Sequence, residues 1–263
     1  MIALVPAYPP AGPAAWGPGE VPVYEGGGSA EPIHAASFDG TNDRLSQPEP
    51  MSGPVDGKRA TFVFDFKLNG GDGASQYIIA GPRSGGIGYW IERMTNNKLR
   101  MLARNLVNQN RVLVDSTATY VAGPSWHRAA LSFDTGAGVS HMVVDRVDVK
   151  NQITMIDDAI DFTVGADVGG NSQSGSKWFN GCLGNVYVNL GEYIDWGLEA
   201  NLNKIWDGTT AIPITGDGSG LTGTAPSFLL ANPFDSFHLD RSGRDNHFTV
   251  IGSLAACADG PLG

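Results

Sequence analysis

Residues 61–68, TFVFDFKL, place a large apolar side chain at every even position, while the odd positions are mostly polar. Successive side chains of an extended strand point to opposite faces, so this period of two is typical of a β-strand with one buried face. The stretch therefore predicts a sheet that packs its phenylalanine side chains against a second layer.

The same kind of signal recurs along most of the chain. Glycine makes up 36 of the 263 residues, about twice the average share, and nearly all links between candidate strands are rich in Gly, Asn, Asp or Ser. Short strands joined by such turns are typical of an antiparallel sandwich. We therefore predict an all-β fold, with further strands at residues 76–80, 88–93, 98–104, 111–115, 126–134, 141–145, 161–165 and 182–189.

Residues 197–207 are the exception and predict one short helix. Asp195 is placed to cap its start and Gly208 to end it. The apolar side chains that fall on one helical face are Leu198, Leu202, Ile205 and Trp206.

Residues 1–33 form a separate segment with seven prolines and many glycines. Proline fixes the backbone and removes a hydrogen-bond donor, so the segment favours an extended chain without a core of its own. We interpret it as an attachment arm that lies along another protein, because its apolar side chains are too frequent for a plain linker; a disordered leader is the alternative.

The net charge of −10, with 27 acidic against 17 basic residues, excludes the basic stripe that nucleic-acid binding needs. No apolar run is long enough to span a bilayer, so membrane insertion is not expected. The two cysteines, Cys182 and Cys257, fit no zinc motif. They form either one disulfide or two buried free thiols, the latter being usual in a reducing cytosol.

Four motifs occur in an order that resembles the laminin G-like, or concanavalin A-like, jelly-roll superfamily. They are SFDGTNDRLS, RATFVFDFKLNG, WHRAALSFDTGAGVSHMVVDRVDV and WFNGCLGNVYVN. The resemblance implies an antiparallel jelly-roll β-sandwich over residues 34–195. Where many members have Asp-Gly after the central hairpin, this chain has Asp145-Arg146, which speaks against a tight two-residue turn there.

Residues 196–263 hold the predicted helix and an extension that we expect to pack on the sandwich. The pieces ITGDGSGLTG, PSFLL and FTVIG resemble the extension that follows this domain in structural proteins of tailed phages. The resemblance implies a homo-oligomeric virion component, such as a spike, fibre or decoration subunit, assembled in the bacterial cytoplasm. Its expected partners are other virion proteins, through the arm, and a host cell-surface polysaccharide.

Catalysis is not expected. Glycosidases of this fold need two carboxylates beside the sugar bond, and no Glu-x-Asp-x-Glu run places them on one strand face. The glutamates at 192 and 199 have the wrong spacing, and His127 and His141 show no evident partner. Zinc-protease and serine-elbow motifs are missing as well. The alternative to a virion component is a carbohydrate-active enzyme or its glycan-binding module.

The loop that leads to Trp178 is the candidate site. Sugars pack their apolar faces on aromatic rings and bond their hydroxyls to polar side chains, so Asn171, Gln173 and Trp178 are the predicted glycan-binding residues. Trp178 could instead cover the sandwich edge. Asp167, at the start of the loop, is a candidate calcium ligand, with an ordinary turn aspartate as the alternative. No other cofactor is expected.

Overall fold

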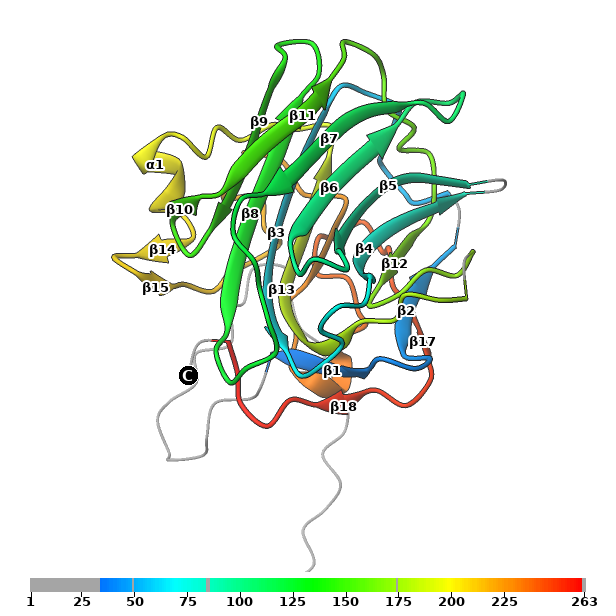
Figure 1. The fold of residues 1–263 in the computed structure, drawn as a ribbon, viewed down its shortest axis with the longest axis vertical. Coiled ribbons are helices and arrows are strands. Elements are labelled where there is room, and N and C mark those ends of the chain that lie inside the picture. Colours follow the sequence, from blue (N-terminus) through cyan, green and yellow to red (C-terminus); the bar gives the residue numbers. More distant parts are fainter. Residues whose placement is uncertain (1–33, 49, 84–85, 174, 262–263) are drawn as a thin grey trace, which may run out of the picture. The chain divides into compact units, whose positions relative to one another are not determined.

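The computed structural model describes residues 34–48, 50–83, 86–173 and 175–261. The arm expected at residues 1–33 lies outside these ranges. Two large antiparallel sheets pack face to face in a jelly-roll sandwich (Figure 1). The predicted all-β fold class is confirmed. Within the described residues, no helix is both long and apolar enough to cross a bilayer.

The first sheet, sheet A, is built around the two long strands β3 and β13, which pair along most of their length. Strands β1 and β16 both pair with β13, β1 with its first half and β16 with its second. In spatial order the strands of sheet A are β10 (Val147–Asp148), β9 (Val139–Val144), β8 (His127–Asp134), β3 (Arg59–Leu68), β13 (Asn180–Leu190), β1 (Ala35–Asp39) and β18 (Ala255–Ala256), with β16 (Phe228–Leu230) also on β13.

The second sheet, sheet B, is a meander extended by strands from both ends of the domain. In spatial order it contains β11 (Lys150–Met155), β7 (Asn110–Ser116), β6 (Leu99–Arg104), β5 (Gly86–Arg93), β4 (Gln76–Arg83), β12 (Ala166–Val168), β2 (Arg44–Gln47) and β17 (Thr249–Ile251). All the predicted strands except the one at 161–165 correspond to strands of the two sheets.

The main core lies between the sheets and contains the even-numbered phenylalanines of β3. The prediction that β3 has one exposed, mostly polar face is wrong, because every residue after Arg59 is buried. The chain after β13 packs on the outer face of sheet A, where Val63 joins a second apolar cluster with Trp196 and Trp206. The polar residues on this face of β3 are satisfied by other chain segments; Thr61 Oγ1, for example, donates to the Glu192 carbonyl at 2.9 Å.

The predicted helix at 197–207 is shorter than expected. Helix α1 contains only Glu199–Leu202, begins after Leu198 and has no side-chain cap. Asp195 instead accepts a hydrogen bond from the Gly197 N–H, at 2.9 Å. The chain then forms a small hairpin, β14 (Trp206–Asp207) with β15 (Thr210–Ala211), beside β9 and β10 (Figure 1). The helical spacing was misleading because it combines an exposed Leu198 with Ile205 and Trp206, which are buried in the second apolar cluster and not along a helix.

The strand predicted at 161–165 does not form. Phe162 and Val164 are buried in the core, which produces the alternating pattern, but their segment pairs with no strand. The backbone N–H groups of Phe162 and Thr163 donate to the Asp56 carboxylate instead, at 2.9 and 3.2 Å. Strand β12 begins one residue after the predicted strand.

The turn between β9 and β10 is a tight two-residue turn, contrary to the sequence expectation. Val144 pairs with Val147, and both Asp145 and Arg146 have positive φ, at 50° and 66°. A mirror-image hairpin turn requires these angles, and arginine adopts them at some cost. The Arg146 guanidinium offsets part of that cost, because it donates to the Gly208 carbonyl at 2.6 Å and pairs with Glu199.

The C-terminal segment is joined to both sheets. It supplies β16 and β18 to sheet A and β17 to sheet B. Cys182 of β13 and Cys257 are joined by a disulfide, and both are buried. Of the two alternatives that the sequence left open, the structure shows the disulfide. Disulfides persist in oxidising surroundings, so we expect this bond to close outside a reducing compartment.

Candidate functional site

The predicted calcium ligand, Asp167, lies on strand β12 and not in an open loop. Its neighbours Ala166 and Val168 point into the core, so its side chain points to the outer face of sheet B. The carboxylate is fully buried, and its Oδ2 accepts a hydrogen bond from the Ser172 N–H at 2.5 Å. Its Oδ1 has no hydrogen-bond partner among the described residues.

Calcium takes six to eight oxygen ligands, commonly from several carboxylates. Within the described ranges, no three His, Cys, Asp or Glu side chains are grouped as a metal site would require. Asp167 alone offers one open carboxylate oxygen. Calcium binding at Asp167 stays a prediction.

The three predicted glycan-binding residues have different environments. Asn171 is fully buried, and its Oδ1 accepts a hydrogen bond from the Gln173 N–H at 2.7 Å, which shapes the loop. Gln173 is exposed. Trp178 is partly buried, with the Arg44 guanidinium 5.4 Å from its ring centroid. A side chain at Gly170 would collide with the indole, so the ring packs directly on that backbone.

Gln173 lines a pocket of about 280 Å³, which we call the loop pocket. Its wall comes from the end of β2, the end of β4 and the loop after β12. Besides a glycine, it is formed by Ser46, Gln47, Pro48, Pro82, Ser172 and Gln173. None of these side chains carries a charge. The wall therefore combines amide and hydroxyl groups with the apolar faces of two prolines.

Gln47 has an unusual position in this wall. Its side chain is partly exposed, but its Oε1 is buried and has no hydrogen-bond partner among the described residues. A buried acceptor without a partner costs about 1–3 kcal/mol. Since this oxygen holds no bond in the protein, the amide can turn toward a ligand without breaking one.

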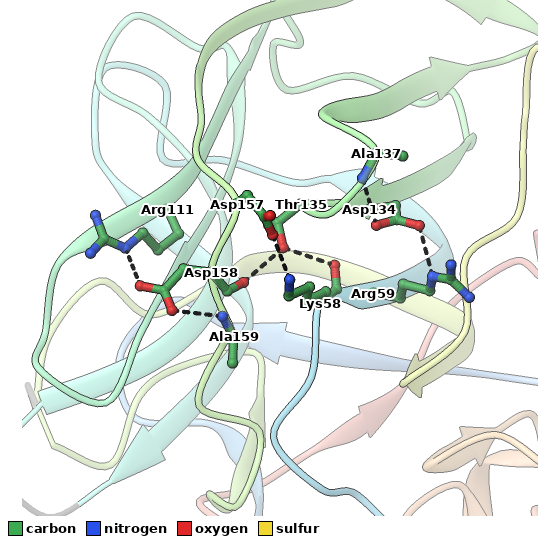
Figure 2. Close-up of polar contacts among 9 residues, drawn as sticks. All are labelled: Lys58, Arg59, Arg111, Asp134, Thr135, Ala137, Asp157, Asp158 and Ala159. Carbon is green, nitrogen blue, oxygen red and sulfur yellow. Dashed lines mark hydrogen bonds and ion pairs between the residues drawn. The ribbon is translucent and has the colours of Figure 1, made fainter.

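A larger pocket, of about 560 Å³, lies between the start of β3 and the turn that joins β8 to β9. We call it the end pocket. Its wall includes Gly57, Lys58, Arg59, Asp134, Gly136 and Gly191. Figure 2 shows three cation–carboxylate pairs at this end of the sandwich: Arg111 with Asp158, Lys58 with Asp157, and Arg59 with Asp134.

Strand pairing positions Arg59. It is the first residue of β3 and lies opposite Asp134, the last residue of β8. Its Nε donates to Asp134 Oδ2 at 2.7 Å, while Asp134 Oδ1 accepts from the Ala137 N–H at 3.1 Å. The Asp134 side chain is 7% exposed and the Arg59 side chain 57%. The buried Asp134 carboxylate, with a hydrogen bond to each of its oxygens, thus holds the exposed Arg59 guanidinium at the pocket wall.

Neighbouring bonds make this end of the molecule rigid. Thr135 joins both sides, since its N–H donates to the Lys58 carbonyl at 2.9 Å and its Oγ1 to the Asp158 carbonyl at 2.7 Å. Hydrogen bonds from Asn105 and Arg111 lower the pKa of the Asp158 carboxyl. The hydrogen bond to Asp157 raises the pKa of the Lys58 ammonium, which therefore stays charged at neutral pH.

Among the described residues, the glutamates do not form a catalytic pair. Glu92 is buried and bonds to Ser75 Oγ at 2.8 Å and Lys177 Nζ at 3.1 Å. Glu199 pairs with Arg146, beside a third hollow of about 680 Å³. Glu192 accepts the Thr61 hydroxyl only through its backbone carbonyl. Among the residues that the structure describes, none in the wall of the loop pocket has a carboxylate side chain.

The two strand histidines do have partners, contrary to the sequence interpretation. His127 Nδ1 lies 2.6 Å from Asp145 Oδ2. His141 Nε2 lies 2.9 Å from the Tyr193 hydroxyl and 3.0 Å from Asp195 Oδ1. Burial lowers the pKa of the His141 imidazole. Neither histidine lines a described pocket, so their contacts hold strands and loops together.

No protein-family model matches the sequence, and no curated protein matches it. Solved structures share the fold. A putative carbohydrate binding protein from Bacteroides ovatus aligns with a TM-score of 0.62 and 14% identity, over 87% of this chain and 61% of that one. This chain thus spans about three fifths of that protein's length.

Two further structures align with lower scores. Domains LG4-5 of the mouse laminin alpha1 chain give a TM-score of 0.47 and 16% identity, over 65% of this chain and 46% of that one. A heptameric SAP-like pentraxin from Limulus polyphemus gives 0.45 and 13%, over 62% and 77%. At 14% identity, the likeness to the Bacteroides ovatus protein shows the fold alone.

Proposed function

We propose that this protein is a non-catalytic carbohydrate-binding module and that the loop pocket is its sugar site. The pocket matches a neutral, hydroxyl-rich ligand in its chemistry. Serine hydroxyls and glutamine amides both donate and accept hydrogen bonds, as sugar hydroxyls require. Pro48 and Pro82 supply apolar surface for the C–H face of a sugar ring, and the volume of about 280 Å³ suits one or two sugar units.

The observation that carries the proposal is the unpartnered Oε1 of Gln47 in the pocket wall. This oxygen is buried in the free protein, so the amide first turns toward the pocket; a sugar hydroxyl can then donate to it and supply a hydrogen bond that the free protein lacks. Gln173, from the loop after β12, provides a second amide in the pocket wall. Two amides that face one pocket from separate chain segments would fix both the position and the orientation of a sugar.

The residues that line the loop pocket favour sugar binding over sugar hydrolysis. Glycoside hydrolysis requires one carboxyl group as acid and a second as base or nucleophile. The described wall of the loop pocket offers amides, hydroxyls and prolines, and the nearby Asp167 is buried and bonded to Ser172. Such a site holds a sugar without activating its glycosidic bond.

A glycan array followed by calorimetric titration tests the proposal. Gln47→Leu and Gln173→Ala should each weaken binding of the best array sugar about tenfold, because a hydrogen bond is lost inside a confined site. Gln109→Ala, an exposed glutamine on the loop before β7, is the matched control and should bind as the parent does. Undiminished binding by folded Gln47 and Gln173 variants would exclude the loop pocket.

We also propose, as the biological setting, that the module is a virion component such as a spike, fibre or decoration subunit. The support is the order of the C-terminal motifs ITGDGSGLTG, PSFLL and FTVIG and the proline-rich residues 1–33. Native mass spectrometry gives the test, since a virion subunit of this kind should form a closed homo-oligomer. A monomer at micromolar concentration would count against this setting and leave the sugar site untouched.

A further inference from the structure

The end pocket differs from the loop pocket in its chemistry, because a guanidinium group forms part of its wall. Arg59 uses only its Nε within the described protein, in the hydrogen bond to Asp134. Its two terminal nitrogens make no hydrogen bond to a described residue. A guanidinium held in this way presents two parallel N–H donors in a fixed orientation.

Two parallel donors of this kind match the two oxygens of a carboxylate. The Arg59 side chain is already ordered in the free protein, because its partner Asp134 is buried and held by the Ala137 N–H. Binding a ligand therefore costs little further side-chain entropy. Three glycines also line the pocket and add no side chain to its wall. Lys58, whose ammonium stays charged, adds a second cation at the rim.

The acidic groups nearby do not block the pocket. Asp157 is paired with Lys58 at 2.6 Å. The Oδ1 of Asp56 is engaged by the N–H groups of Phe162 and Thr163. Asp134 has a bond to each of its oxygens. The charges that line the wall therefore balance, and both terminal nitrogens of Arg59 remain open.

We infer that the end pocket is a second binding site, separate from the loop pocket, and that it takes a small ligand bearing a carboxylate on the Arg59 guanidinium. Acidic sugars and simple organic acids share this chemistry. In the bound state the two carboxylate oxygens accept from the two terminal nitrogens of Arg59, while Asp134 keeps its bond to Nε. The rest of the ligand lies over Gly57, Gly136 and Gly191.

The test uses three probes on the full chain at low ionic strength: D-galacturonate, D-galactose and acetate. The two sugars differ only in a carboxylate or a hydroxymethyl group at C6. The readout is the Nε–H signal of each arginine in a nitrogen–proton correlation spectrum, with affinity from calorimetry. Galacturonate should shift the Arg59 signal in a saturable way, and galactose should leave it in place. If acetate binds as well as galacturonate, the carboxylate alone is recognised; if it binds more weakly, the sugar ring contributes.

Variants assign the effect to one guanidinium. Arg59→Gln should weaken galacturonate binding at least tenfold. Arg111→Gln is the matched control, because Arg111 is also held through Nε by a carboxylate at this end, but it does not line the pocket. It should bind within twofold of the parent. Arg59→Lys keeps the charge and the partner of Asp134 but removes the two parallel donors, so it should fold and still bind several-fold more weakly.

Three results would overturn the inference. The first is an Arg59 signal that galacturonate leaves unmoved. The second is an equal shift with galactose, which would make the carboxylate irrelevant. The third is an Arg59→Lys or Arg59→Gln variant that folds and keeps full affinity. Gln47→Leu changes only the loop pocket, so its effect on neutral sugars is independent of all three results.

Discussion

Arg128 connects the sandwich to the chain that covers its outer face, and replacing it should have a large effect on stability. It lies on β8 directly opposite Asp65 on β3. Its Nε and Nη2 bond to the two Asp65 oxygens at 2.6 and 2.8 Å. Its Nη1 donates to the backbone carbonyls of Ile205, at 2.7 Å, and Ile212. The side chains of the pair are 1% and 2% exposed.

Arg128→Met removes the cation but leaves the Asp65 carboxylate buried, with the Asn185 amide, at 2.5 Å, as its one remaining side-chain partner among the described residues. Breaking a buried pair from one side typically costs about 3–5 kcal/mol. The total free energy of unfolding of a single domain is roughly 5–15 kcal/mol. With an m-value of about 2 kcal/mol per molar urea, the midpoint of unfolding should fall by about 2 M.

Urea unfolding followed by tryptophan fluorescence measures this shift. Arg100→Met is the matched control, since Arg100 pairs with Asp115 on the outer face of sheet B, where the side chains are 29% and 13% exposed. That pair should contribute at most about 1 kcal/mol. The double variant Asp65→Leu with Arg128→Met should recover most of the loss, because no charge is left buried. Equal midpoints for Arg128→Met and Arg100→Met would refute the reasoning.

Three more predictions concern the disulfide, a histidine and the arm. Reducing Cys182–Cys257, which are 75 positions apart, should destabilise the fold by roughly 4 kcal/mol of chain entropy, measured as a lower urea midpoint with reductant. The lowered pKa of His141 means that the unfolded chain takes up its proton first, so stability should fall as the pH drops below about 6.5, and His141→Gln should flatten this decline in melting curves. A chain without residues 1–30 should keep a β-dominated circular dichroism spectrum; if it unfolds, the interpretation of these residues as an attachment arm is wrong.

Local pattern predicted the strands well, since alternation, turn residues and strand length are all local properties. Local pattern failed to predict which strand residues are buried where the segment that covers them is distant in the sequence. Asp65 and Thr61 looked solvent-exposed because a polar residue in a strand usually is, and their partners are 63 and 131 positions away. The residues next to β3 in the sequence do not indicate that the chain after β13 covers the outer face of this strand.

Contacts between distant segments also explain why the two pockets were predicted only in part. Gln173 was predicted as an exposed polar loop residue and does line a pocket, but Gln47 joins it only because β2 pairs with β12. Asn171 is buried and bonds the backbone of its own loop, which the sequence alone does not distinguish from an exposed loop asparagine; its role in glycan binding stays a prediction. The end pocket went unpredicted because Arg59 and Asp134 meet through the register of β3 and β8. That register could have been found by aligning the buried positions of the two predicted strands.

The central claim, that a sugar binds in the loop pocket, is tested most directly by titrating the best array sugar into nitrogen-labelled protein and following the side-chain amide signals. The proposal predicts saturable shifts of the Gln47 and Gln173 amides at one common affinity, with the exposed Gln109 amide unmoved. Saturable binding that leaves the Gln47 and Gln173 signals in place would contradict the claim and assign the sugar to another surface.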